Sequence, residues 1–80
     1  MSYEPTPTAL AGRRLFGERI RQLRAEHGLS QEALALGAGL DRSFLADIES
    51  GRHSFALDRL FDLAVALDVS PHELLLDDVQ

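Results

Sequence analysis

The sequence predicts a single all-α domain of five helices, and three observations support this fold class. Apolar residues recur at the three- and four-residue spacing of a helix. Capping residues and glycines separate the periodic segments after short gaps, so consecutive helices are expected to pack on each other. No segment shows the alternating pattern of a half-buried strand. A chain of 80 residues supports one domain at most.

The N-terminal segment MSYEPTPTALAG contains two prolines and no steady period. We therefore expect a flexible arm over residues 1–12, with a helical start near Thr8 as an alternative. The first full helix is predicted over Arg13–His27, and Gly28 fits the left-handed position that ends it. Three residues at i, i+4 and i+7 form its predicted inner stripe: Phe16, Ile20 and Leu23.

Two short helices separated by a tight turn are predicted next. Ser30 caps a helix over Gln31–Ala38, which Gly39 ends. Asp41 then caps a helix that ends at Gly51. Two short helices joined by the tripeptide GLD have helix-turn-helix spacing.

The C-terminal third of the chain predicts two further helices. One covers Leu57–Leu67. The segment Ser70–Glu73 reads as a capping box with proline at the first helical position, and it starts a last short helix through Leu74–Leu76. The domain is thus expected over residues 13–76, followed by a tail over residues 77–80.

The helix after Asp41 has a low outer ridge. At about 100° per residue, its bulky residues share one face, and the opposite face carries Ser43, Ala46 and Ser50. Small side chains allow a helix to enter the major groove of B-DNA deeply. Arg42 and Asp47 flank this ridge, and they can donate to guanine and accept from cytosine N4, respectively. An ordinary solvated face with small residues is the alternative.

The charge is unevenly distributed. The net charge is −5, but residues 1–57 contain seven arginines and seven acids, whereas residues 58–80 contain one arginine and six acids. All eight cations are arginines, which suit forked recognition of phosphate or guanine. If the chain binds DNA, the acidic C-terminal part is expected to point away from it, and the specific complex is expected to be salt-sensitive.

Several function classes lack support in the sequence. There is no cysteine, hence no disulfide or thiolate metal site, and the three histidines, His27, His53 and His72, have no metal-ligand spacing. There is no glycine-rich phosphate loop and no plausible catalytic triad, so we expect no enzyme, metal, cofactor or small-molecule effector. No apolar run reaches 18 residues and no secretory signal is recognisable, so we expect a cytoplasmic protein without membrane association.

The segment from Phe16 to Leu75 resembles the phage-repressor and Cro-like (XRE-type) helix-turn-helix family. The matching features occur in the family order: RIRQLR, GLSQEALA, Ala35-x-x-x-Gly39, FLADIESGR and LFDLAVALDVSPHEL. The resemblance implies a compact, lambda-repressor-like domain that binds double-stranded DNA and regulates transcription. The short chain and the segment DRSFLADIESGRHS look most like the controller proteins of restriction–modification systems.

The resemblance also implies residue roles by position. Gln31 matches a glutamine that hydrogen-bonds a DNA phosphate, and a helix N-terminus suits an anion, although a plain polar residue is the alternative. Three residues match base-facing positions: Arg42, Ser43 and Asp47. Three residues match positions near the phosphate backbone: Ser50, Arg52 and Ser54. His53 lies among them, either as a further contact, favoured by protonation, or as a bystander.

Two further residues match an internal ion pair of the family. Arg24 closes the first helix, and Glu49 flanks the buried face of the helix after Asp41. The pair is expected to be structural and to fix that helix against the first one. Phe44 stands where tyrosine is common, and we expect it in the core rather than against a thymine methyl group.

The helix over Leu57–Leu67 is apolar over too wide an arc for a surface helix. Its predicted core residues are Leu60, Leu63, Ala64 and Leu67. The excess apolar surface consists of Leu57, Phe61 and Val65, with Leu76 nearby. The resemblance implies a symmetric homodimer on a palindromic site, with recognition helices about one DNA turn apart, and we expect it to form through this surface. The alternative is that the N-terminal arm folds over the patch.

Two other functions remain compatible with these residues. The same fold serves antitoxin-type modules that neutralise a partner toxin, and the apolar surface would then bind a different protein. An adaptor that has lost DNA binding is the third possibility.

Overall fold

A computed structural model describes residues 3–75, and within that range it consists of four α-helices and one 3-10 helix. In chain order these are α1 (Pro7–Glu26), α2 (Gln31–Ala38), α3 (Arg42–Glu49), α4 (Leu57–Leu67) and η1 (Pro71–Leu75). The all-α fold class is confirmed. Leu76 and the predicted tail over residues 77–80 lie outside the described residues, as do residues 1 and 2.

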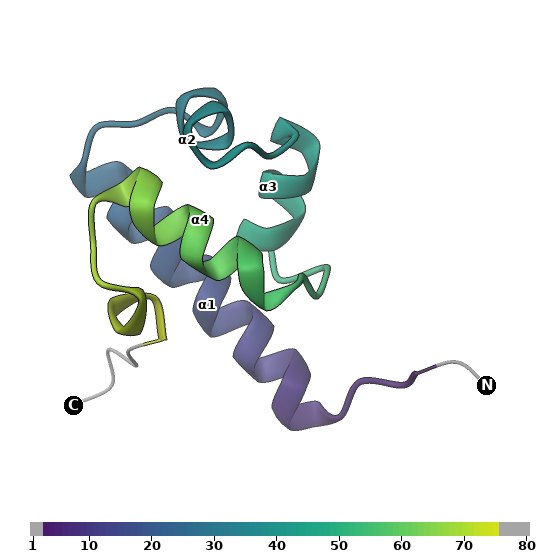
Figure 1. Cartoon of the computed structure of the whole chain (residues 1–80). Coiled ribbons are helices and arrows are strands. Elements are labelled where there is room, and N and C mark those ends of the chain that lie inside the picture. Colours follow the sequence, from purple (N-terminus) through teal and green to yellow (C-terminus); the bar gives the residue numbers. More distant parts are fainter. Residues whose placement is uncertain (1–2, 76–80) are drawn as a thin grey trace.

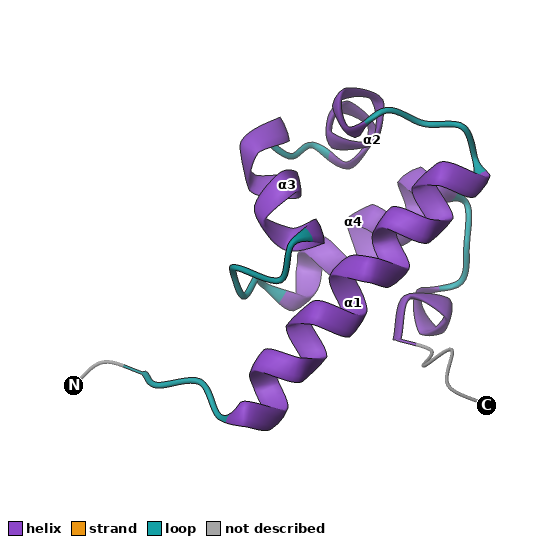
Figure 2. Cartoon of the chain, turned by 180° about the vertical axis from the view of Figure 1, so that it is seen from behind, coloured by secondary structure: helices purple, strands orange, loops and turns teal. Residues whose placement is uncertain are grey.

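The helices α2 and α3 lie side by side above α1 and α4 in Figure 1, where α4 passes in front of α1. α2 packs against both α4 and α3, whereas α1 packs against α3 and η1. The view from behind shows the same arrangement with α1 in front (Figure 2). In both views the first turns of α1 extend beyond the other helices.

α1 begins at Pro7, close to the helical start near Thr8 that was the alternative, so the expected start at Arg13 and the flexible arm as far as residue 12 are wrong. Thr6 caps it: the Thr6 Oγ1 accepts a hydrogen bond of 3.0 Å from the Ala9 N–H. Pro7 occupies the first helical position, where its missing N–H costs nothing. The early turns carry no apolar stripe, and therefore periodicity could not reveal them.

The helix-turn-helix segment is confirmed. α2 spans the predicted residues, and Gly39 ends it in the left-handed conformation, with φ at 69°. The side chains of Ser30 and Asp41 cap α2 and α3 by accepting from the N–H groups of Ala33 and Ser43, each at 3.0 Å. α3 ends at Glu49, two residues before the predicted Gly51.

The predicted fifth helix is wrong in type. Ser70 and Glu73 do form the capping contact, since the Ser70 N–H donates to Glu73 Oε2 at 3.0 Å. The described segment that follows is a 3-10 helix of five residues. The contact of α1 with this segment includes a hydrogen bond of 2.9 Å from Arg19 Nε to the Glu73 carbonyl.

The core lies between all five elements. The predicted inner stripe of α1 and the predicted core residues of α4 are buried. The buried apolar residues of the described chain are Phe16, Ile20, Leu23, Leu34, Ala35, Ala38, Leu45, Ile48, Leu60, Leu63, Ala64, Leu67 and Leu74. Glu49 is the one buried charged residue among residues 3–75.

Gly17 brings α1 and α3 into close contact. A Cβ atom at this position would lie 2.5 Å from the Glu49 carbonyl oxygen and would also clash with the carbonyl oxygen of Ile48. The backbone of α1 therefore runs directly against the last turn of α3. This close contact fixes the angle between α1 and α3.

Candidate nucleic-acid interface

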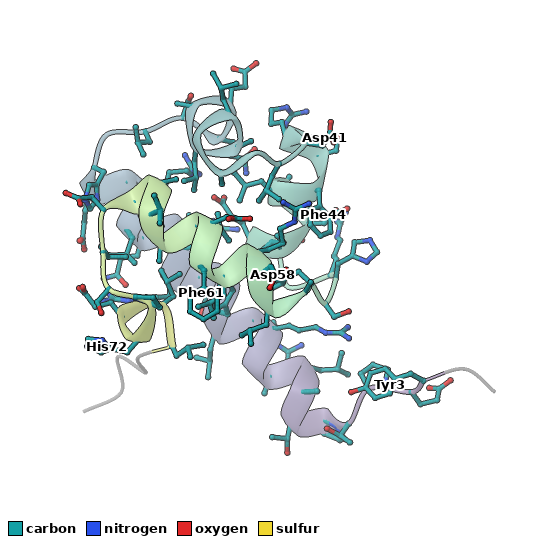
Figure 3. All side chains as sticks on the ribbon, in the orientation of Figure 1. Tyr3, Asp41, Phe44, Asp58, Phe61 and His72 are labelled. Atoms are coloured by element: carbon teal, nitrogen blue, oxygen red, sulfur yellow. The ribbon has the colours of Figure 1, made fainter. Side chains whose placement is uncertain are left out.

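The low ridge of α3 faces outward. Ser43 and Ser50 are exposed and Ala46 is half-buried, whereas Leu45 and Ile48 are buried behind them. No segment among residues 3–75 covers the two serines. The Asp41 cap lies at the outer end of the same helix (Figure 3). α3 thus presents small side chains on a rigid, well-packed helix, as the sequence predicts.

Phe44 is half-buried and packs against the edge of the core. Its ring centroid lies 6.4 Å from that of His53, so the two rings share the surface between α3 and the following loop. This placement agrees with the core role that we expected for Phe44.

Arg42 lies in the first turn of α3 with its side chain exposed. Its Nη1 donates a long hydrogen bond of 3.4 Å to Oε1 of Gln31, the first residue of α2. The first residues of the two motif helices are therefore in direct contact. The forked end of Arg42 retains further N–H donors for an external acceptor.

Glu49 is the centre of a hydrogen-bond network that holds α1, α2 and α3 together. Its carboxylate accepts from Arg24 Nε at 2.7 Å and from Arg24 Nη2 at 3.1 Å, which makes the pair bidentate. The amide Nε2 of Gln31 donates to the same carboxylate at 2.9 Å. The Arg24 Nη1 also donates to the Leu29 carbonyl at 2.9 Å. The two residues that sequence reasoning paired are thus in contact.

Sequence reasoning missed Arg21 as a third partner of Glu49. The Arg21 Nη2 donates to the Glu49 carbonyl at 3.4 Å, and its Nε lies 3.9 Å from Oε1. Arg21 precedes Arg24 by three residues, which places both on one face of α1. The three-residue spacing of these arginines in RIRQLR could have predicted that both contact Glu49.

Asp47 contacts the loop that follows α3. Its carboxylate lies 3.5 Å from His53 Nε2 and 4.0 Å from Arg52 Nη1. The Ser50 Oγ donates to the Asp47 carbonyl at 3.1 Å. Four of the predicted interface residues thus form one contiguous group at the C-terminal end of α3.

Ser54 lies apart from this group. It lines a mostly apolar hollow of about 380 Å³, together with residues of α1, α4 and η1. The hydroxyl group is exposed, but no hydrogen bond or ion pair joins it to Arg52 or His53.

The excess apolar surface of α4 is exposed. The exposed fractions are 67% for Leu57, 48% for Phe61 and 80% for Val65. Figure 3, in which α4 lies in front, shows the Phe61 side chain below this helix. Residues 3–6 leave these three side chains uncovered, which counts against the alternative that the arm folds over them.

Residues 3–75 contain neither a candidate metal site nor a candidate membrane span. No group of three or more His, Cys, Asp or Glu side chains among residues 3–75 has the geometry of a metal site. Within the same range, none of the helices combines the length and apolar character needed to cross a membrane.

Residues 20–74 match the helix-turn-helix family. The chain is 41% identical over 64 residues to the control protein C.BamHI of Bacillus amyloliquefaciens, covering 79% of each protein. It superimposes on the restriction–modification controller protein C.AhdI from Aeromonas hydrophila with a TM-score of 0.78 and 47% identity, covering 80% of this chain and 97% of that one.

A third comparison involves a structure that contains DNA. The biofilm regulator SinR, solved in complex with DNA, matches with a TM-score of 0.72 and 39% identity, covering 76% of this chain and 98% of that one. Together with the exposed ridge on a capped two-helix motif, these matches show that the chain belongs to the helix-turn-helix family of regulators.

Proposed function

We propose that this protein binds a specific site on double-stranded DNA as a homodimer and regulates transcription. The observation that carries the proposal is the outward ridge of α3, which is low enough to enter a major groove and is fixed from behind by buried residues. The similarity to C.BamHI and C.AhdI supports a controller role within a restriction–modification system.

Base recognition is assigned to the outer face of α3. Arg42 donates to guanine O6 and N7, and Ser43 beside it in the first turn adjusts the fit. Asp47 accepts from cytosine N4 with the lone pairs that its two oxygens retain beside Arg52, 4.0 Å from Oδ1, and His53, 3.5 Å from Oδ2. Because Gln31 contacts Arg42 at 3.4 Å, it also restricts the directions in which the guanidinium can point.

Contacts with the DNA phosphate backbone are assigned to both ends of the helix-turn-helix motif. At the start of α2, the free N–H groups of the first turn and the second N–H of the Gln31 amide face a phosphate. The other end consists of Ser50, Arg52 and His53, and Ser54, which lies apart from them, belongs to the proposal from the sequence alone. The Arg24–Glu49 pair touches no DNA in this arrangement, and it keeps α3 at a fixed angle to α1 and α2.

The exposed apolar face of α4 is assigned to the dimer. Leu57, Phe61 and Val65 lie on a different helix from the ridge, so each protomer can use both surfaces at once. A two-fold axis through α4 would place two copies of α3 on a palindromic site, with half-sites about 34–36 Å apart. Leu76 belongs to the same proposal from the sequence alone.

The proposal is tested by selecting bound duplexes from a random pool and measuring the affinity of the enriched sequence. We expect a palindrome that binds about 10³-fold or more tighter than a scrambled duplex of the same composition. Sedimentation of the free protein should show a homodimer. A monomer or aggregate without enrichment of any duplex would instead favour the antitoxin-type function.

A further inference from the structure

Two arginines on α1 have no role in the function described so far. Among residues 3–75, the side chains of Arg13 and Arg14 are without a hydrogen-bond or ion-pair partner. They are adjacent in sequence and therefore point about 100° apart around α1. Arg13 lines the apolar hollow near Phe55, whereas Arg14 lies on the side of α1 that meets the end of α3.

The backbone of α1 at Arg14 lies directly against Gly51. A Cβ atom on Gly51 would be 3.1 Å from Arg14 Cα and 2.9 Å from Arg14 Cγ. Gly51 lies between Ser50 and Arg52, two of the residues assigned to the DNA backbone. The Arg14 side chain therefore starts at the edge of the proposed interface, although it comes from a helix outside the motif.

A hollow of about 250 Å³ opens at this junction. Its walls come from α1 and from the end of α3, and they consist of Arg14, Glu18, Arg21, Glu49 and Ser50. The Arg21 side chain is 57% exposed, and it contacts Glu49 through a hydrogen bond of 3.4 Å and an ion pair of 3.9 Å. The carboxylate of Glu49 is already bound by Arg24 at 2.7 Å. Arg14 is thus the cation of this hollow without a partner among residues 3–75, Arg21 retains further N–H donors, and Glu18 opposes both.

We propose that this hollow binds a phosphate group of the DNA backbone next to the half-site read by α3. Arg14 and Arg21 donate to the phosphate oxygens, and the two guanidinium groups clamp it from α1. The inference rests on the proposed DNA-binding function and extends the contact surface beyond the helix-turn-helix motif. Arginine suits this task because its planar fork matches phosphate oxygens.

The proposal predicts opposite effects for neighbouring charges. Arg14→Gln and Arg21→Gln should weaken DNA binding, whereas Glu18→Gln should strengthen it because the variant removes an anion beside the phosphate. Arg13→Gln is the matched control, because it makes the same change in net charge on the same helix but on another face. Circular dichroism of each variant establishes that the fold is retained.

The test measures affinity for the selected duplex and for a scrambled duplex at salt concentrations from about 50 to 200 mM. A dimer carries each substitution twice, so Arg14→Gln should lower the slope of log affinity against log salt by about 1.8. When the salt concentration rises fourfold, the factor by which affinity falls should therefore be about 12 times smaller for the variant than for the wild type. The effect should be equal for both duplexes, since phosphates carry no sequence information.

Three outcomes would overturn this inference while leaving the proposed function intact. The first is an equal effect of Arg14→Gln and Arg13→Gln, which would mean that only net charge matters. The second is a loss confined to the selected duplex, which would assign Arg14 to a base. The third is saturation of the Arg14 and Arg21 Nε–H signals by low millimolar inorganic phosphate in a nuclear magnetic resonance titration, which would assign the hollow to a free anion. If the wild type binds neither duplex, the proposed function fails, and this inference fails with it.

Discussion

Replacing Glu49 with alanine should destabilise the fold more than any change to an exposed charge. The carboxylate is almost fully buried, and it accepts three hydrogen bonds of 2.7–3.1 Å from Arg24 and Gln31. The substitution leaves the Arg24 guanidinium, whose side chain is only 18% exposed, without its anion. It also leaves the Gln31 amide without an acceptor.

The expected cost is about 3–5 kcal/mol, because breaking a buried pair from one side leaves a charge that water cannot fully solvate. A chain of this length has a total stability of about 4–12 kcal/mol. At about 4–8 °C per kcal/mol for a domain of this size, the midpoint of thermal unfolding should fall by at least about 12 °C. Glu49→Gln should cost less, because it keeps the shape and one acceptor oxygen.

The measurement is urea unfolding followed by circular dichroism, with Arg59→Ala as the control. Arg59 pairs with Asp62 at 3.4 Å, but both side chains are over 40% exposed. The control should therefore cost about 0–1 kcal/mol. If Glu49→Ala costs no more than Arg59→Ala, the network is not what holds α3 in place.

Three further predictions concern the interface, the helix packing and the dimer. Arg42→Ala should cost about 1–3 kcal/mol of binding and relax the preference at one base pair; in competition assays with single-base variants, uniform weakening would assign Arg42 to phosphate instead. Gly17→Ala should destabilise the fold by about 1–3 kcal/mol because its Cβ meets the α3 backbone. Gly12→Ala, with nothing within 4 Å, should stabilise α1 by about 0.5–1 kcal/mol in the same unfolding assay, and equal effects of the two changes would refute the close approach. In sedimentation, Phe61→Glu should shift the protein toward monomer and lose operator binding, whereas Leu36→Glu on α2 should stay dimeric; a dimeric Phe61→Glu would remove α4 from the interface.

The helix-turn-helix motif was predictable because its signals are local. Ser30 and Asp41 cap their helices from positions that the sequence alone identifies, and Gly39 ends α2 as its type suggests. The ridge of α3 followed from helical periodicity, since the opposite face had to be buried. These features depend on residues within a few positions of each other.

The features that the sequence did not predict have two physical causes. The first turns of α1 have good capping and helix propensity but no apolar stripe, so apolar periodicity indicates Arg13 as the start of a helix that begins at Pro7. The contacts of Arg14 with Gly51 and of Arg21 with Glu49 join residues 28 or more positions apart, and the packing of α1 on α3 creates them. The hydrogen bond from the Gln31 amide to Glu49 likewise could not be predicted from the sequence, because the packing of α2 on α3 creates it.

Major-groove recognition by Arg42 can be tested by removing one acceptor atom from the DNA. In the selected duplex, the guanine assigned to Arg42 is replaced by a deaza analogue that lacks N7 but pairs normally. Wild-type binding should weaken by about 0.5–1.5 kcal/mol, or about 2- to 13-fold, because the analogue removes one of the two acceptors of a pair worth about 1–3 kcal/mol. The Arg42→Ala variant should bind both duplexes equally. An unchanged wild-type affinity, or the same loss in the variant, would contradict base reading by the first turn of α3.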